Sequence, residues 1–117
     1  MSTDREFLEL AAKAYGITGR WVTNYDGDYY YQGNTDGIYY EYPEGGSAVW
    51  NPITDDGDAF RIAVKLELDI IFYRKHVVVC DKSRTQNVYR EDFSSDKVSA
   101  VRRAIVMAAA EIGRAMP

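Results

Sequence analysis

The stretch from residue 21 to residue 50 restricts the fold most strongly, because its composition favours strands and turns over helix. Two turn-like segments interrupt it, Asp26-Gly27 and residues 34–37, and such sequences are typical of tight turns between antiparallel strands. We therefore predict a three-stranded antiparallel meander. Its strands are the runs rich in aromatic and β-branched residues at 21–25, 29–32 and 38–42.

Three other stretches have the periodicity of amphipathic helices. At the start of the chain, Thr3 and Glu6 fit a capping box, and Gly16 is suited to end the first helix in the left-handed conformation. The second helix is expected to begin with Thr54 as its N-cap. The third is expected to begin near residues 94–95, and its many alanines allow close packing.

Between the second and third helices, the pattern predicts strands at 70–73 and 76–80 and a short strand at 87–90. The resulting order α-β-β-β-α-β-β-β-α predicts an α+β fold. We expect an α/β/α sandwich in which helices cover both faces of a mostly antiparallel sheet. At 117 residues the chain has the usual size of one domain, which we assign to residues 1–117.

The net charge of −4 conceals an uneven distribution. Between residues 21 and 60 there are eight acidic residues and no Lys or Arg, together with seven of the ten tyrosines. Residues 61–117 carry a balance of +4. Because like charges repel, the acidic block argues against direct binding of nucleic-acid phosphates. It favours a partner protein with a basic surface.

The tyrosines and acids of this block are suited to a protein interface. Tyrosine offers a large, rigid contact surface, which is why interfaces are enriched in it, and carboxylates around it accelerate encounter with a basic partner. Consecutive tyrosines on a strand point to opposite faces, so some of them are expected to pack inward. The candidate partner-binding residues are Asp26, Asp28, Tyr29, Tyr31, Asp36, Tyr40, Glu41 and Glu44.

His76 and Cys80 are the only residues of their types. On one continuous strand they are about 13 Å apart, at roughly 3.3 Å per residue, which is too far for proton transfer between them. An enzyme would have to combine His76 with carboxylates from distant segments, and this alternative stays open. A single cysteine excludes a disulfide within the chain and a cysteine-based zinc site.

No cofactor and no metal ion are expected. The acidic run at 55–58 is explained by the start of the second helix, where carboxylates favour the helix dipole. A small-molecule binding protein, for instance one that takes up a nucleotide signal, is a further alternative. Such a protein would have an aromatic cavity near Arg61, Arg90 or Arg102.

The sequence also bears on cellular location. No apolar run approaches the roughly 18 residues that a membrane helix needs. The polar N-terminal residues do not resemble a secretory signal. We therefore expect an intracellular protein without a membrane partner.

Residues 8–14, 50–66 and 101–113 contain helix starts and core stripes that resemble a small family of bacteriophage and prophage proteins. That family is known for an alpha-beta-alpha sandwich domain. The resemblance implies the fold and a phage origin, and it implies no mechanism. At the end of the second helix this chain has Glu67 where a glycine is expected.

The resulting hypothesis is a phage accessory protein that acts in the host bacterial cytoplasm without catalysis. It would bind and inhibit a host protein of anti-phage defence, for example of a CRISPR system. The acidic, tyrosine-rich surface would dock on the basic nucleic-acid-binding surface of that protein. Formation of a homodimer is left open.

Overall fold

The computed structural model describes residues 3–25, 35–82 and 88–117. The order of the elements confirms the predicted alternation of helices and strands. Along the chain they are α1 (Asp4–Tyr15), β1 (Arg20–Tyr25), β2 (Thr35–Glu41), β3 (Ser47–Trp50), α2 (Asp56–Lys65), β4 (Asp69–Phe72), β5 (His76–Cys80), β6 (Tyr89–Asp92) and α3 (Lys97–Ala115).

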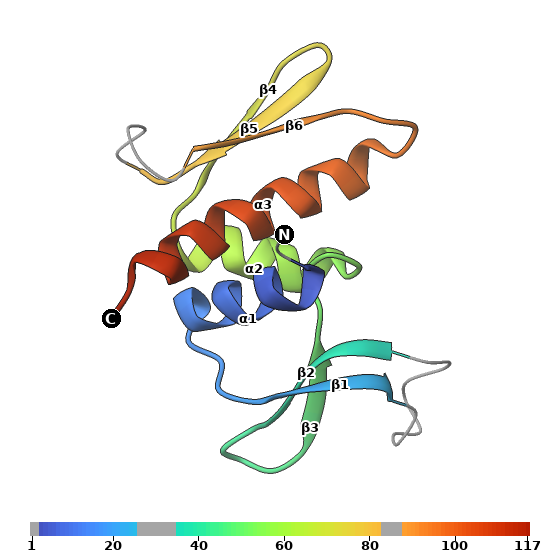
Figure 1. Cartoon of the computed structure of the whole chain (residues 1–117), viewed down its shortest axis with the longest axis vertical. Helices are drawn as coiled ribbons and strands as arrows, with labels where there is room; N and C mark the ends of the chain where they lie inside the picture. Colours follow the sequence, from blue (N-terminus) through green and yellow to red (C-terminus); the bar gives the residue numbers. More distant parts are fainter. Residues whose placement is uncertain (1–2, 26–34, 83–87) are drawn as a thin grey trace.

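The strands form two antiparallel sheets, β1-β2-β3 and β4-β5-β6. The α+β class and the antiparallel pairing are thus confirmed. Figure 1 shows the helices as a layer between the sheets, with β1–β3 below and β4–β6 above. The sequence pattern predicts a single sheet between helices, whereas here two small sheets enclose the helices.

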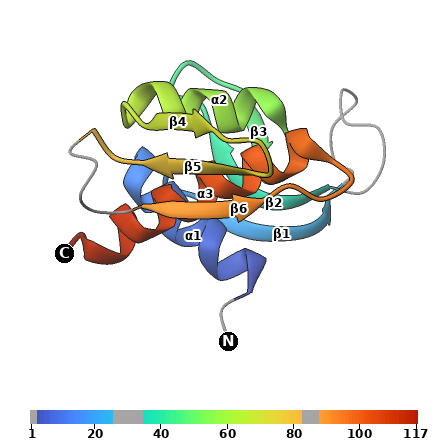
Figure 2. The same cartoon turned by 90° about the horizontal axis from the view of Figure 1, so that it is seen from above.

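The sequence of α3 explains why the helices occupy the middle layer. Its buried residues include the consecutive positions Ala104, Ile105 and Val106, so they cannot all lie on one side of the helix. Contacts with α1 and α2, and with β5 and β6, cover it on several sides. Figure 2 shows the β4–β6 sheet lying over α3. This alanine-rich helix therefore packs on the β4–β6 sheet and on α1, which in turn contacts β2 of the other sheet.

One hydrophobic core runs through the three layers. Ile38 and Trp50 enter it from the β1–β3 sheet, and Val77 and Val79 enter it from the β4–β6 sheet. Buried side chains of all three helices complete it. Within the part of the chain that the structure describes, no helix is long and apolar enough to span a bilayer.

The first helix begins and ends where the sequence predicts. The Glu6 N–H donates to the Thr3 hydroxyl (3.3 Å), and Gly16 ends α1 at a φ of 97°. The other two N-caps differ from the prediction. Asp55 caps α2 in place of Thr54, whose N–H is used in a turn with the Asn51 carbonyl (3.2 Å). Asp96 caps α3 by accepting from the Ser99 N–H (3.1 Å).

The strands of the first sheet also differ from the prediction. The predicted strand at 29–32 lies outside the described residues. The third strand of the sheet is Ser47–Trp50, which the sequence pattern does not predict. Its last three residues are all buried, so it lacks the alternation of apolar and polar residues that marks a half-exposed strand.

Candidate functional site

The structure describes four of the eight predicted partner-binding residues. Asp36, Tyr40 and Glu41 belong to β2, and Glu44 follows in the turn between β2 and β3. Asp26, Asp28, Tyr29 and Tyr31 lie outside the described residues. The candidate site is therefore built here from the β2–β3 hairpin and its neighbours.

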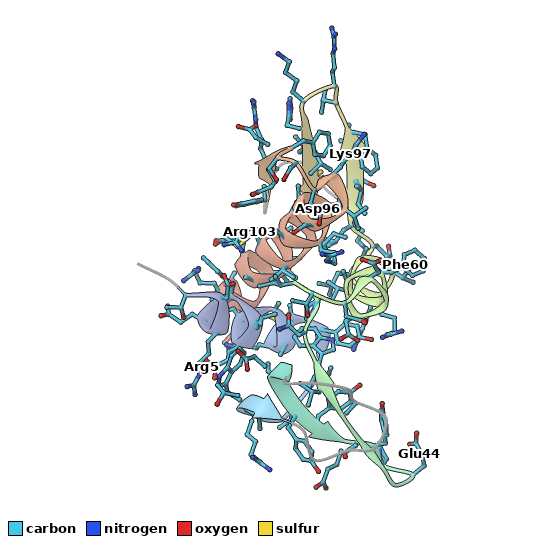
Figure 3. The ribbon with its side chains drawn as sticks, turned by 90° about the vertical axis from the view of Figure 1, so that its right-hand side faces the viewer. Arg5, Glu44, Phe60, Asp96, Lys97 and Arg103 are labelled. Atoms are coloured by element: carbon cyan, nitrogen blue, oxygen red, sulfur yellow. The ribbon has the colours of Figure 1, made fainter. Side chains whose placement is uncertain are left out.

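Two glycines shape the turn of this hairpin. Gly45 and Gly46 have φ angles of 103° and 96°, in the left-handed region that favours glycine. Hydrogen bonds between Tyr42 and the two glycines close the turn at 2.9 and 3.1 Å. Glu44 lies at the tip, at the end of the molecule farthest from α3 in Figure 3. The turn thus presents an exposed carboxylate on a defined backbone.

The two tyrosines in the middle of β2 point to opposite faces of the sheet, as strand geometry predicts. Tyr40 packs partly against the core on the inner face. Tyr39 lies on the outer face, where the Arg20 guanidinium stands 4.8 Å from its ring centre. Glu41 shares the outer face and is exposed. The predicted residues Tyr40 and Glu41 therefore belong to different faces of one strand.

A cavity of about 360 Å³ separates the hairpin from the start of α2. Tyr40 and Tyr42 line one side of it, with their rings edge to face and 5.3 Å between centres. Asp55, Asp58 and Arg61 line the other side. The structure thus brings Tyr40 together with charged side chains of α2 that the interface prediction did not include.

Asp58 and Arg61 form the polar floor of this cavity. The Asp58 carboxylate is buried and accepts from the Asn51 N–H (3.0 Å) and from Arg61 Nη2 (2.7 Å). Burial raises the pKa of the Asp58 carboxyl above its ordinary value, while these two hydrogen bonds act in the opposite direction. The ion pair leaves Arg61 largely exposed, so its guanidinium stays accessible from the cavity.

Asn51 connects the two sides of the cavity through hydrogen bonds. Its side-chain amide donates to the Asp36 carbonyl (2.9 Å) at the start of β2. Its side-chain oxygen accepts from the Ile53 N–H (3.0 Å) just before α2. Together with the bond to Asp58, these contacts fix the position of α2 relative to the hairpin. No sequence motif signals this arrangement, because it depends on one asparagine that bridges three segments.

The residues considered for catalysis lie on the other sheet. His76 begins β5, and its ring stacks on Tyr73 at 4.6 Å between centres. Cys80 ends the same strand and is buried. Within residues 3–25, 35–82 and 88–117, no three His, Cys, Asp or Glu side chains gather as a metal site would require.

A scan against family models and searches of curated proteins and of solved structures found no match for the chain.

Proposed function

We propose that this protein is a non-catalytic binding module that docks on a basic surface of a partner protein. The docking surface is the acidic aromatic face, which we define as Tyr40, Tyr42, Glu44 and Asp55; Glu41 lies on the opposite face of β2. One observation carries the proposal: the β2–β3 hairpin presents the exposed Tyr42 ring beside the turn that carries the exposed Glu44, and the Tyr40 ring packs edge to face against Tyr42.

The chemistry of this face suits a cationic partner. Tyr40 supports Tyr42 from the inner face of the sheet, so the exposed ring has a defined position at little further entropic cost. Glu44 and Asp55 are both exposed, and carboxylates around an aromatic contact speed encounter with a basic surface. A nucleic acid would be repelled by the same charges.

We further propose that the partner is a protein that binds nucleic acid. A protein that binds nucleic acid places Lys and Arg side chains where they contact phosphates. Carboxylates of another protein can occupy the positions of those phosphates. The resemblance to phage proteins directs the search to bacterial defence proteins of this kind, including those of CRISPR systems. The protein would then act in the cytoplasm of the bacterial host as an inhibitor.

Two matched pairs of variants test the proposal. The chain is used to capture proteins from bacterial lysate at low salt, and the affinity of an identified nucleic-acid-binding partner is then measured at several salt concentrations. Glu44→Lys is expected to weaken binding about tenfold and to flatten its salt dependence. Tyr42→Ala is expected to cost a further factor of about ten or more.

The controls make the same changes on the other sheet. Asp92→Lys alters the net charge by the same amount on β6, and Tyr73→Ala removes an exposed ring near the β4–β5 turn. Both should bind like the wild type. Unchanged affinity and salt dependence in Glu44→Lys would refute the docking surface.

A small-molecule function is the second candidate, because Tyr40, Tyr42 and Arg61 line one cavity. Aromatic rings beside a guanidinium are a suitable environment for a nucleotide base and its phosphate. A thermal shift with nucleotides that disappears in Arg61→Ala, together with no protein partner, would favour this function over the first.

A further inference from the structure

The hairpin of β4 and β5 carries aromatic rings and positive charges at its turn. Residues 72–75 are Phe, Tyr, Arg and Lys, and all four are exposed. Phe72 is 58% exposed and Tyr73 is 51% exposed. Figure 3 shows this yellow hairpin at the end of the molecule opposite Glu44. A tight hairpin turn favours Gly, Asn or Asp, so folding alone does not account for this composition.

Backbone hydrogen bonds hold this turn on both sides. The Tyr73 N–H donates to the His76 carbonyl (2.9 Å), and the Phe93 N–H donates to the Lys75 carbonyl (2.9 Å). The register of β4 and β5, continued by one pair, places Tyr73 opposite His76, so residues 74 and 75 form the tip. The side chains of the turn therefore project from a backbone of defined position.

Tyr73 and His76 form a flat aromatic platform. Their ring centres are 4.6 Å apart, and the ring planes differ by 11°. Both rings lie on the outer face of the sheet, because the neighbouring Val77 is buried on the inner face. His76 covers one face of the tyrosine ring, while half of Tyr73 stays exposed. The open face of Tyr73 is thus suited to stack on a further flat ring, such as a nucleobase.

The two cations at the tip are available to bind an anion. Neither Arg74 nor Lys75 forms an ion pair with another residue that the structure describes. The carboxylate opposite His76 in the strand register is that of Asp92, and it already pairs with Arg90 (3.0 Å). The turn therefore carries two positive charges beside its aromatic platform, and the nearest acid in the register does not neutralise them.

These features favour single-stranded nucleic acid over other anionic partners. Proteins bind single strands by stacking bases on aromatic rings and by contacting phosphates with cations. In a double helix the bases stack on one another, so they offer no free face. An anionic membrane would favour apolar residues at the tip, whereas this tip is Arg74-Lys75. An acidic peptide would engage the two cations and leave the platform unused.

We propose that the β4–β5 turn binds single-stranded nucleic acid, with a base stacked on Tyr73 and the adjoining phosphates on Arg74 and Lys75. This site goes beyond the proposed function and does not depend on it, since Glu44 of the acidic aromatic face lies at the opposite end (Figure 3). The longest axis of the molecule is 40 Å, whereas salt at 0.1 M screens charges over about 10 Å. The carboxylate at the far end therefore acts only weakly on a strand at the turn.

Fluorescence anisotropy of a labelled oligothymidylate decamer, titrated with the full chain at low salt, tests the site. We expect a dissociation constant of about 10–100 µM, as for non-specific binding. The logarithm of the association constant should fall against the logarithm of the salt concentration with a slope of about −1.4, because two phosphates are contacted. A decamer of abasic nucleotides has the same phosphates without bases, and it should bind about tenfold more weakly.

Two variants separate the stacking contact from the phosphate contacts. Tyr73→Leu removes the ring and should weaken binding of oligothymidylate about tenfold without changing the salt slope. It should also remove the preference over the abasic decamer. Arg74→Gln/Lys75→Gln should weaken binding and bring the salt slope close to zero, because the phosphates lose both cations.

The controls make equivalent changes away from the turn. Phe60→Leu removes an exposed ring on α2, and Lys82→Gln/Arg114→Gln removes two exposed cations. Both controls should bind like the wild type. Wild type that does not bind oligothymidylate at about 1 mM, or that binds the abasic decamer equally well, would overturn the proposal. Tighter binding to phosphatidylserine vesicles or to polyglutamate would also overturn it, by assigning the turn to a membrane or to an acidic protein.

Discussion

At the end of α2, Glu67 adopts a backbone conformation that favours glycine. Its φ angle is 53°, in the left-handed region, and it is the one non-glycine residue with a positive φ in the described part of the chain. The Leu68 N–H reaches back to the Ala63 carbonyl (3.0 Å) across this residue. This bond satisfies a carbonyl of the last helical turn, and it requires the left-handed residue between them.

Replacement of Glu67 by glycine is therefore expected to stabilise the fold. The left-handed conformation costs an ordinary residue about 1–2 kcal/mol, and glycine avoids this cost. The greater freedom of glycine in the unfolded chain offsets part of the resulting stabilisation. We expect the free energy of unfolding to rise by about 0.5–1 kcal/mol in urea titrations of Glu67→Gly. Glu67→Ala is the control, because it removes the exposed contact with Lys82 (3.4 Å) and keeps the strain. Equal stability of the two variants would show that the backbone is unstrained.

Between elements, the backbones of α1 and α3 approach each other closely at a glycine. A Cβ atom added at Gly113 would lie 1.9 Å from the Leu10 carbonyl oxygen. No side chain fits into that space, so the two helices would have to separate. This contact explains why the long alanine-rich helix contains a glycine near its end, where helix propensity alone would disfavour it.

Gly113→Ala is accordingly expected to destabilise the protein, although alanine favours helix formation. We expect a loss of about 3 kcal/mol in the free energy of unfolding, measured by chemical denaturation, because backbone atoms cannot give way as side chains do. Arg114→Ala is the neighbouring control. It removes only an exposed ion pair with Glu111 (3.4 Å) and should change the stability by less than about 0.5 kcal/mol. A neutral Gly113→Ala would mean that α1 can move away without loss.

These elements show which features the sequence determines locally. The helices could be predicted because their apolar stripes and capping residues lie within a few positions of one another. The caps of α2 and α3 are displaced by one or two residues, since neighbouring Ser, Thr and Asp residues are all good caps and only the path of the preceding loop decides among them. The left-handed conformation of Glu67 is set by its position just after the last turn of α2 and not by its side chain.

The tertiary arrangement of strands and the site could be predicted only in part. Opposite orientations of Tyr39 and Tyr40 follow from strand alternation. The division into two sheets does not follow from any local pattern, because it depends on α3 being covered on several sides. The cavity beside Tyr40 depends on the Asn51 bridge, which joins segments that no local pattern links.

For the whole molecule, the division into two sheets raises the question of whether the chain unfolds as one unit. Among the strands that the structure describes, each sheet pairs only within itself, and no ladder of backbone hydrogen bonds connects the two sheets. The connection is made by side chains, since one hydrophobic core includes Trp50 from the first sheet and Val77 and Val79 from the second. Helix α3 packs on β5 and β6 and on α1, which contacts β2.

We therefore expect a single cooperative transition, in agreement with one domain over residues 1–117. Fluorescence of Trp50, which is buried and stacks on Tyr15 at 5.8 Å, reports on the β1–β3 side. Hydrogen exchange of the Val77 and Val79 amides reports on the β4–β6 side. At one protein concentration, both probes should give the same free energy of unfolding within about 1 kcal/mol. Earlier opening of β4–β6, with Trp50 fluorescence still native, would show that α3 does not couple the two sheets and that the core is divided at that helix.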